Sequence, residues 1–163
     1  MPITAAKNLR NALAILCGIG ALSAVLAQEQ KPARSPSVWD GVYSEKQAAI
    51  GKARYVRTCS ECHGDDLEGD IVEHPQLAGG DFVDKWNGLD LGQLFERIHR
   101  DMPMDRPGSL DRETSVDLIA YILSANRFPA GEYDLPRDPE ILKQIRIERE
   151  PPASGNKTSE KKP

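Results

Sequence analysis

The sequence predicts an all-α domain, on two observations. Apolar side chains recur at the spacing of a helix in three segments, over residues 45–59, 90–100 and 112–125. No segment shows the strict alternation of apolar and polar residues that is typical of a half-buried strand. We therefore expect three main helices joined by long loops.

The first predicted helix follows Ser44. The pattern Ser44-x-x-Gln47 is that of a capping box, in which each side chain accepts a hydrogen bond from the backbone N–H of the other residue. The helix should run to Cys59, with Gly51 and Tyr55 near one face.

The second and third predicted helices begin after aspartates that can cap them, Asp90 and Asp111. The buried faces are formed by apolar side chains three or four positions apart. These are Leu91, Leu94, Phe95 and Ile98 in the second helix and Val116, Ile119, Ala120 and Leu123 in the third. Glycines and prolines predict irregular loops over residues 64–80 and 101–110. Residues 141–147 are expected to pack on the surface as a short helix or strand.

The first residues have the pattern of a secretory signal peptide. Lys7 and Arg10 precede an uncharged apolar run over residues 12–26, and small residues offer a cleavage site before Gln28. Cleavage would also discard Cys17, whereas an uncleaved run would be a membrane anchor. We predict a signal peptide (1–27), a linker (28–41), a folded domain (42–148) and a disordered tail (149–163).

The strongest functional signal is the motif Cys59-Ser60-Glu61-Cys62-His63. Cys-x-x-Cys-His is the attachment signal of a c-type haem. The two thiols can add to the two vinyl groups of one porphyrin, while the adjacent imidazole can bind the iron. The motif therefore predicts one covalent haem c, with Cys59, Cys62 and His63 in the site.

Other uses of a Cys-x-x-Cys pair fit less well. Structural zinc sites normally have four protein ligands in paired clusters, and the remaining histidines, His74 and His99, lie far apart in the sequence. No βαβ pattern surrounds the pair to support a thioredoxin-like site. A disulfide across two residues would close too short a loop to stabilise a fold well.

Beyond the motif, Pro75-Gln76-Leu77-Ala78-Gly79 and Met102-Pro103 make the chain similar to class I c-type cytochromes over residues 42–146. The resemblance implies the class I cytochrome c fold, with three main helices and long loops wrapped round one covalent haem. It implies that the carbonyl of Pro75 accepts the second imidazole N–H of His63. It also implies that Met102 is the second axial ligand of the iron, with Met104 as the alternative.

Trp86 is expected either to line the haem edge, where its indole N–H can donate to a propionate, or to pack in the core. Residues 102–110 and 120–131 resemble a narrower group, the bacterial periplasmic cytochromes associated with quinoprotein dehydrogenases. That resemblance implies a periplasmic electron-transfer protein rather than an enzyme. Its partners would be a dehydrogenase, such as a quinoprotein dehydrogenase, and a terminal oxidase or another cytochrome.

The charge of the chain is consistent with this function. The formal net charge is −4, and loss of the signal peptide would make the chain more acidic. An acidic surface argues against nucleic acid and membrane surfaces as partners. Two alternatives remain open: a haem subunit fixed within a dehydrogenase complex, and a haem enzyme or gas sensor with a labile sixth ligand.

Overall fold

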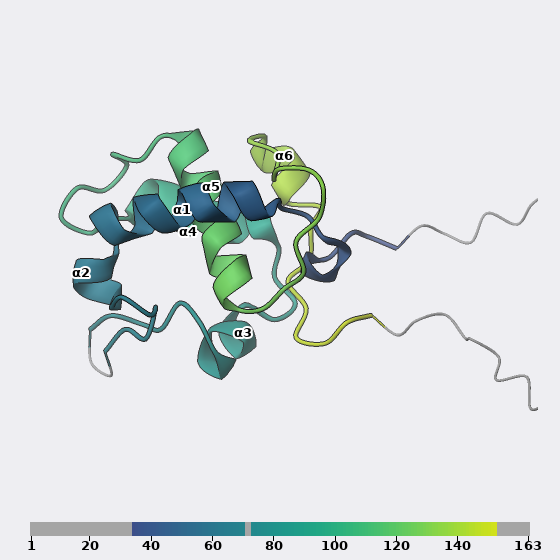
Figure 1. Cartoon of the computed structure of the whole chain (residues 1–163), viewed down its shortest axis with the longest axis horizontal. Coiled ribbons are helices and arrows are strands. Elements are labelled where there is room, and N and C mark those ends of the chain that lie inside the picture. The colour runs from purple at the N-terminus through teal and green to yellow at the C-terminus, as the bar shows by residue number, and fades with distance from the viewer. Residues whose placement is uncertain (1–33, 71–72, 153–163) are drawn as a thin grey trace, which may run out of the picture. The chain divides into compact units, whose positions relative to one another are not determined.

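The computed structural model of the protein describes residues 34–70 and 73–152, and within these the regular secondary structure is helical, with isolated β-bridges and no strand (Figure 1). In chain order the helices are η1 (Val38–Asp40), α1 (Glu45–Thr58), α2 (Ser60–His63), α3 (Gly80–Trp86), α4 (Leu91–Asp101), α5 (Arg112–Ala125) and α6 (Pro139–Leu142). The all-α prediction is confirmed. The predicted signal peptide lies outside the described residues, as do residues 28–33 of the predicted linker and 153–163 of the predicted tail.

The three main helices begin at the predicted caps. The Asp90 side chain accepts from the backbone N–H of Gln93 at 2.9 Å, and that of Asp111 accepts from Thr114 at 2.7 Å. Ser44 accepts from the backbone N–H of Gln47 at 3.0 Å. The first capping box is only half formed, however, because the Gln47 amide binds the backbone of residue 135 and the carboxylate of residue 117 instead.

The core is built on the crossing of α1 over α5 (Figure 1). Gly51 lies at this crossing, where a Cβ atom added to the glycine would be only 1.9 Å from the backbone oxygen of Asp117. The rings of Tyr55 and Tyr121 pack there with their centroids 5.2 Å apart. Only glycine allows helices to approach this closely, because any side chain at Gly51 would meet the backbone of α5.

The start and the end of the domain differ from the prediction. Part of the predicted linker is packed against the folded domain: Val38 is fully buried, and its backbone N–H donates to Arg146 at 2.9 Å. The indole N–H of Trp39 donates to the backbone oxygen of Glu148 at 2.8 Å. The folded region thus begins before residue 42 and extends to Arg149, whose N–H donates to the Asn87 side chain at 3.0 Å.

The surface position expected for residues 141–147 is wrong. They begin in the short helix α6 and place Leu142 and Ile147 in the core, both fully buried. The backbone of this segment then pairs with the turn before α4, through Ile147 N–H to Leu89 at 2.8 Å and Leu91 N–H to Ile145 at 3.0 Å. Pairings between such distant segments leave no local pattern in the sequence.

Candidate haem site

The end of α1 leads directly into the Cys-x-x-Cys-His motif. Cys59 caps α1, and α2 then forms a single turn in which the backbone N–H of His63 donates to the Cys59 carbonyl at 2.9 Å. Both cysteines are free thiols, with Cys59 half-buried and Cys62 exposed. Burial raises the pKa of the Cys59 thiol. One helical turn therefore carries both thiols and the imidazole.

The His63 imidazole is held by the loop that follows. Its Nδ1 lies 2.9 Å from the backbone oxygen of Pro75, the contact expected from the resemblance. Because a carbonyl can only accept, Nδ1 carries the proton and Nε2 is free to bind a metal ion. The residue is only 8% exposed, and this burial lowers the pKa of the imidazole, which favours the neutral form that binds iron.

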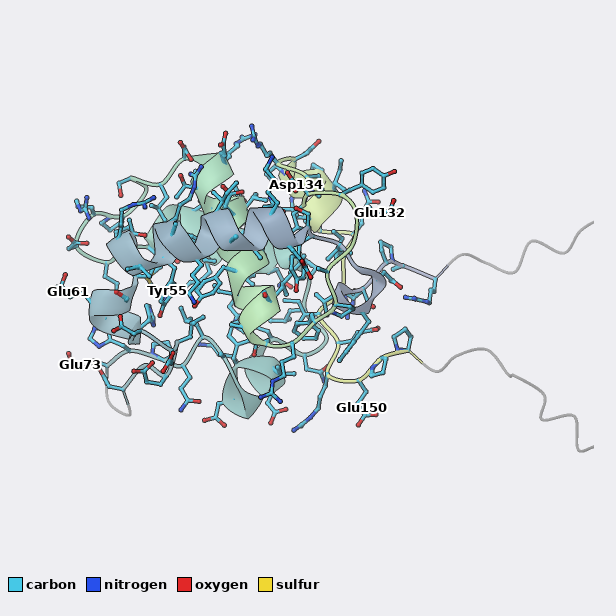
Figure 2. All side chains as sticks on the ribbon, in the orientation of Figure 1. Tyr55, Glu61, Glu73, Glu132, Asp134 and Glu150 are labelled. Atoms are coloured by element: carbon cyan, nitrogen blue, oxygen red, sulfur yellow. The ribbon has the colours of Figure 1, made fainter. Side chains whose placement is uncertain are left out.

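Backbone contacts close the loop over residues 64–79. The Tyr55 hydroxyl reaches from α1 (Figure 2) and donates to the Gly64 carbonyl at 2.6 Å. Further along, Leu77 N–H donates to Leu67 at 2.9 Å. Gly69 has a φ of +59°, and a Cβ there would lie 2.2 Å from the His74 oxygen. The loop needs glycine at this point because the two stretches of backbone touch.

The other two histidines are engaged with protein groups. His74 lies beside His63, with ring centroids 6.1 Å apart, and its Nδ1 is 2.5 Å from an Asp70 carboxylate oxygen. His99 stacks on Phe95 at a centroid distance of 5.0 Å, and its Nδ1 lies 3.3 Å from the hydroxyl of residue 115. His74 therefore lies beside His63 in the loop that follows it, and His99 lies within α4 rather than in the loop after that helix.

The methionine-bearing loop lies next to the end of α1. A cavity of about 360 Å³ is lined both by Thr58, which precedes the first cysteine, and by Pro103, which follows Met102. Met102 caps α4 and is half-buried, whereas Met104 is 70% exposed. In Figure 1 this loop and α2 lie at the same end of the domain, on the left.

The two tryptophans have different environments. Trp39 uses its indole N–H in a hydrogen bond to Glu148. Trp86 ends α3, is half-buried and packs near Phe82 with centroids 6.2 Å apart. Within the described part of the chain its indole N–H makes no hydrogen bond, so this donor is available to an acceptor such as a propionate.

These residues fit a covalently attached haem. Two unbonded thiols and an imidazole with a free Nε2 lie on one turn, and a backbone carbonyl fixes the other imidazole nitrogen. In residues 34–70 and 73–152 no group of three or more His, Cys, Asp and Glu side chains is placed to hold a metal ion without such a cofactor. No helix of these residues is long and apolar enough to cross a membrane.

Comparison with a protein family agrees with this geometry. Residues 46–122 match the model of the family described as cytochrome C oxidase, cbb3-type, subunit III. No curated protein matches the sequence. Among solved structures the chain is similar to the sulfane dehydrogenase SoxCD from Paracoccus pantotrophus, with a TM-score of 0.44 and 22% sequence identity. The similarity covers 67% of this chain and 61% of that chain.

Proposed function

We propose that the protein is a c-type cytochrome with covalently bound haem c and a periplasmic carrier of single electrons. The match of residues 46–122 to the family described as cytochrome C oxidase, cbb3-type, subunit III supports this proposal. In this proposal one haem is attached through Cys59 and Cys62. His63 and Met102 are the axial ligands of its iron. The protein shuttles electrons from a dehydrogenase to a respiratory acceptor and performs no chemistry on a substrate.

The observation that carries the proposal is the contact between His63 Nδ1 and the Pro75 carbonyl at 2.9 Å, next to two free thiols. This hydrogen bond orients the imidazole, fixes its tautomer and makes Nε2 a better electron donor. His63 is also buried, with only 8% of the residue exposed. Each of these effects supports a permanent ligand better than one that dissociates.

Exposure favours Met102 over Met104 as the distal ligand. A ligand to buried iron must be shielded from water, and Met104 is 70% exposed whereas Met102 is half-buried. The remaining histidines are less suited: His74 lies beside His63, with ring centroids 6.1 Å apart, and His99 stacks on Phe95 within α4. A thioether ligand favours ferrous iron and so raises the reduction potential.

In this proposal the protein residues hold the haem and shield its iron. When bound, haem c supplies an iron that gains and loses one electron. His63 and Met102 would together hold the iron, so that neither peroxide nor a gas would find a ready binding position. Pro75 holds the imidazole in place, and the Trp86 indole N–H is available to orient a propionate. A redox partner needs only a small, transient interface near the haem edge.

The location and the partners extend the proposal. The signal pattern over residues 1–27 supports export to the periplasm, where haem attachment to Cys-x-x-Cys-His takes place. We propose a quinoprotein dehydrogenase as the electron donor, on the local resemblance of residues 102–110 and 120–131, and a terminal oxidase or another cytochrome as the acceptor. Mass spectrometry of the periplasmic protein should find an N-terminus near Gln28, and an intact Met1 in the membrane fraction would contradict cleavage.

Haem staining on a denaturing gel tests the function directly. Full-length protein produced with a haem-attachment system should stain for covalent haem. Cys59→Ala or Cys62→Ala should weaken or abolish the stain, and His63→Ala should abolish stable low-spin ferrous haem. Cys17→Ala and His99→Ala are matched controls that should keep both signals. A folded wild-type protein without covalent haem would contradict the proposal.

A further inference from the structure

Asn126, at the end of the last main helix, binds the loop that carries Pro75. It caps α5, and its side chain is half-buried. Its Nδ2 donates to the Leu77 carbonyl at 2.9 Å, and its Oδ1 accepts from the backbone N–H of Gly79 at 2.9 Å. The Nδ2 group also donates to the Ile122 carbonyl at 2.8 Å within the helix.

These three hydrogen bonds determine the orientation of the carboxamide. Its oxygen must face the N–H of Gly79, and its nitrogen must face two carbonyls, so neither group can exchange places with the other. The side chain therefore holds two backbone groups of the loop, two residues apart, at a fixed distance from α5. This is more than a helix cap requires, because the partners lie 47 and 49 positions earlier in the sequence.

The held segment is continuous with the acceptor of the His63 hydrogen bond. A single residue, Gln76, separates Pro75 from Leu77. Leu77 is also fixed on its other side, where its N–H donates to Leu67 at 2.9 Å. The position of the Pro75 carbonyl thus depends on a backbone segment that Asn126 ties to the most buried helix of the domain.

We infer that Asn126 is a positioning residue for the axial histidine. Asn126 fixes Leu77 and Gly79 and thereby keeps the Pro75 carbonyl in line with His63 Nδ1. The strength of that hydrogen bond sets how strongly the imidazole donates electrons to the iron. The inference rests on the proposed function, since it assigns His63 to the iron. Asn126 contacts neither His63 nor Pro75 directly, so the inference links the end of α5 to the reduction potential through the loop backbone.

The expected direction follows from the hydrogen bond. A strong acceptor at Nδ1 makes the imidazole a more basic ligand, and a more basic ligand stabilises ferric iron. When Asn126 is replaced, the loop is less restrained and the contact between His63 and Pro75 weakens. The ferric state should then be less favoured, so the midpoint potential should move to a more positive value.

Gln47 provides a matched control at another part of the domain. Its side-chain amide also holds a distant backbone residue from both sides, because Oε1 accepts from Leu135 N–H at 2.7 Å and Nε2 lies 3.5 Å from the Leu135 carbonyl. Gln47 is only 4% exposed. Its removal should lower the unfolding temperature without moving the loop over residues 64–79.

The test compares the full-length, haem-loaded wild type with Asn126→Ala, Asn126→Ser and Gln47→Ala. Asn126→Ala should give a more positive midpoint potential in a redox titration. It should also make exchange of the His63 Nδ1 proton with solvent at least tenfold faster by NMR. Gln47→Ala should keep the wild-type potential and exchange rate while its unfolding temperature falls.

The outcomes separate this inference from the proposed function. Unchanged potential and exchange in Asn126→Ala, or equal changes in Gln47→Ala, would show that Asn126 only stabilises the fold. If Asn126→Ala does not fold, Asn126→Ser replaces it, because serine is uncharged and can still cap α5. The same two measurements, the midpoint potential and the exchange of the His63 Nδ1 proton, then test the inference. A wild-type protein without covalent haem would contradict the proposed function itself.

Discussion

The crossing of α1 and α5 and the loops around His63 are stabilised in different ways. At the crossing, protein groups satisfy one another: Asp117 is only 6% exposed, and its carboxylate accepts a hydrogen bond from Gln47 Nε2 at 3.2 Å and forms an ion pair with Arg54, whose Nε lies 3.1 Å away. Burial raises the pKa of that carboxyl. At the loops, by contrast, the thiols of Cys59 and Cys62 form no disulfide.

This difference separates what the chain specifies alone from what its cofactor completes. Close packing around Gly51 and Tyr55 needs only protein atoms. The side chains proposed to hold the haem are positioned by the turn of α2 and by the hydrogen bond between His63 and the Pro75 carbonyl. Two thiols and the second imidazole nitrogen are left for a cofactor in that proposal. Substitutions at the crossing should therefore change stability, whereas those in the loops should change the haem as well.

The largest effect on stability is expected at Gly51. A Cβ there would lie 1.9 Å from the Asp117 backbone oxygen and 2.9 Å from Tyr121 Cβ, so Gly51→Ala must push the two helices apart. We expect a loss of about 3 kcal/mol in the free energy of unfolding, measured with denaturant. Gly80→Ala is the control, because no atom lies within 4 Å of its Cβ position, and it should be nearly neutral. Equal losses in both variants would contradict the close crossing.

An intermediate effect is expected at Gly69, in the loop over residues 64–79. The left-handed φ of +59° costs an alanine about 1–2 kcal/mol, and the clash with the His74 oxygen at 2.2 Å adds to it. Gly69→Ala should also change the spectrum or potential of the haem, since the clash lies next to Pro75. Gly108 is the control, since it has a φ of +73° and nothing lies within 4 Å of its Cβ position. Gly108→Ala should therefore lose only the free energy of unfolding that the left-handed backbone costs an alanine. A wild-type haem potential in Gly69→Ala would mean that the loop does not position the axial histidine.

The smallest effect is expected at Tyr55, which joins the two regions. Its ring is fully buried at the helix crossing, and its hydroxyl donates to the Gly64 carbonyl at 2.6 Å. Tyr55→Phe keeps the ring and removes one hydrogen bond, so thermal or denaturant unfolding should show a loss of about 1–2 kcal/mol. Tyr121→Phe is the comparison, because within the described residues its hydroxyl makes no hydrogen bond. Similar losses in both variants would argue against the contact with Gly64.

Much of the fold could be predicted because its signals are local. Asp90 and Asp111 cap the helices that follow them, and the apolar positions of α4 and α5 repeat with the helical period. Cys59, Cys62 and His63 lie within one helical turn, so the sequence motif alone predicts that they are close together. The contact of His63 with Pro75 spans only 12 positions and could be predicted from the resemblance.

The features that the sequence did not reveal depend on contacts between distant segments. Residues 37–40 fall within the predicted linker, and their pairing with Arg146 and Glu148 makes them part of the domain. Asn126 has the pattern of an ordinary helix stop, and its bonds to Leu77 and Gly79 have no signature in the sequence. Such contacts depend on how the helices pack, which a local pattern does not encode.

The near-infrared spectrum of the oxidised protein tests most directly whether the loops place a haem iron between His63 and Met102. A bound thioether gives a sulfur-to-iron absorption band, so the haem-loaded wild type and Met104→Ala should both show it. Met102→Ala should lose the band and open the iron to carbon monoxide. If the band is missing from the wild type, or is lost in Met104→Ala and kept in Met102→Ala, the assignment of Met102 is contradicted.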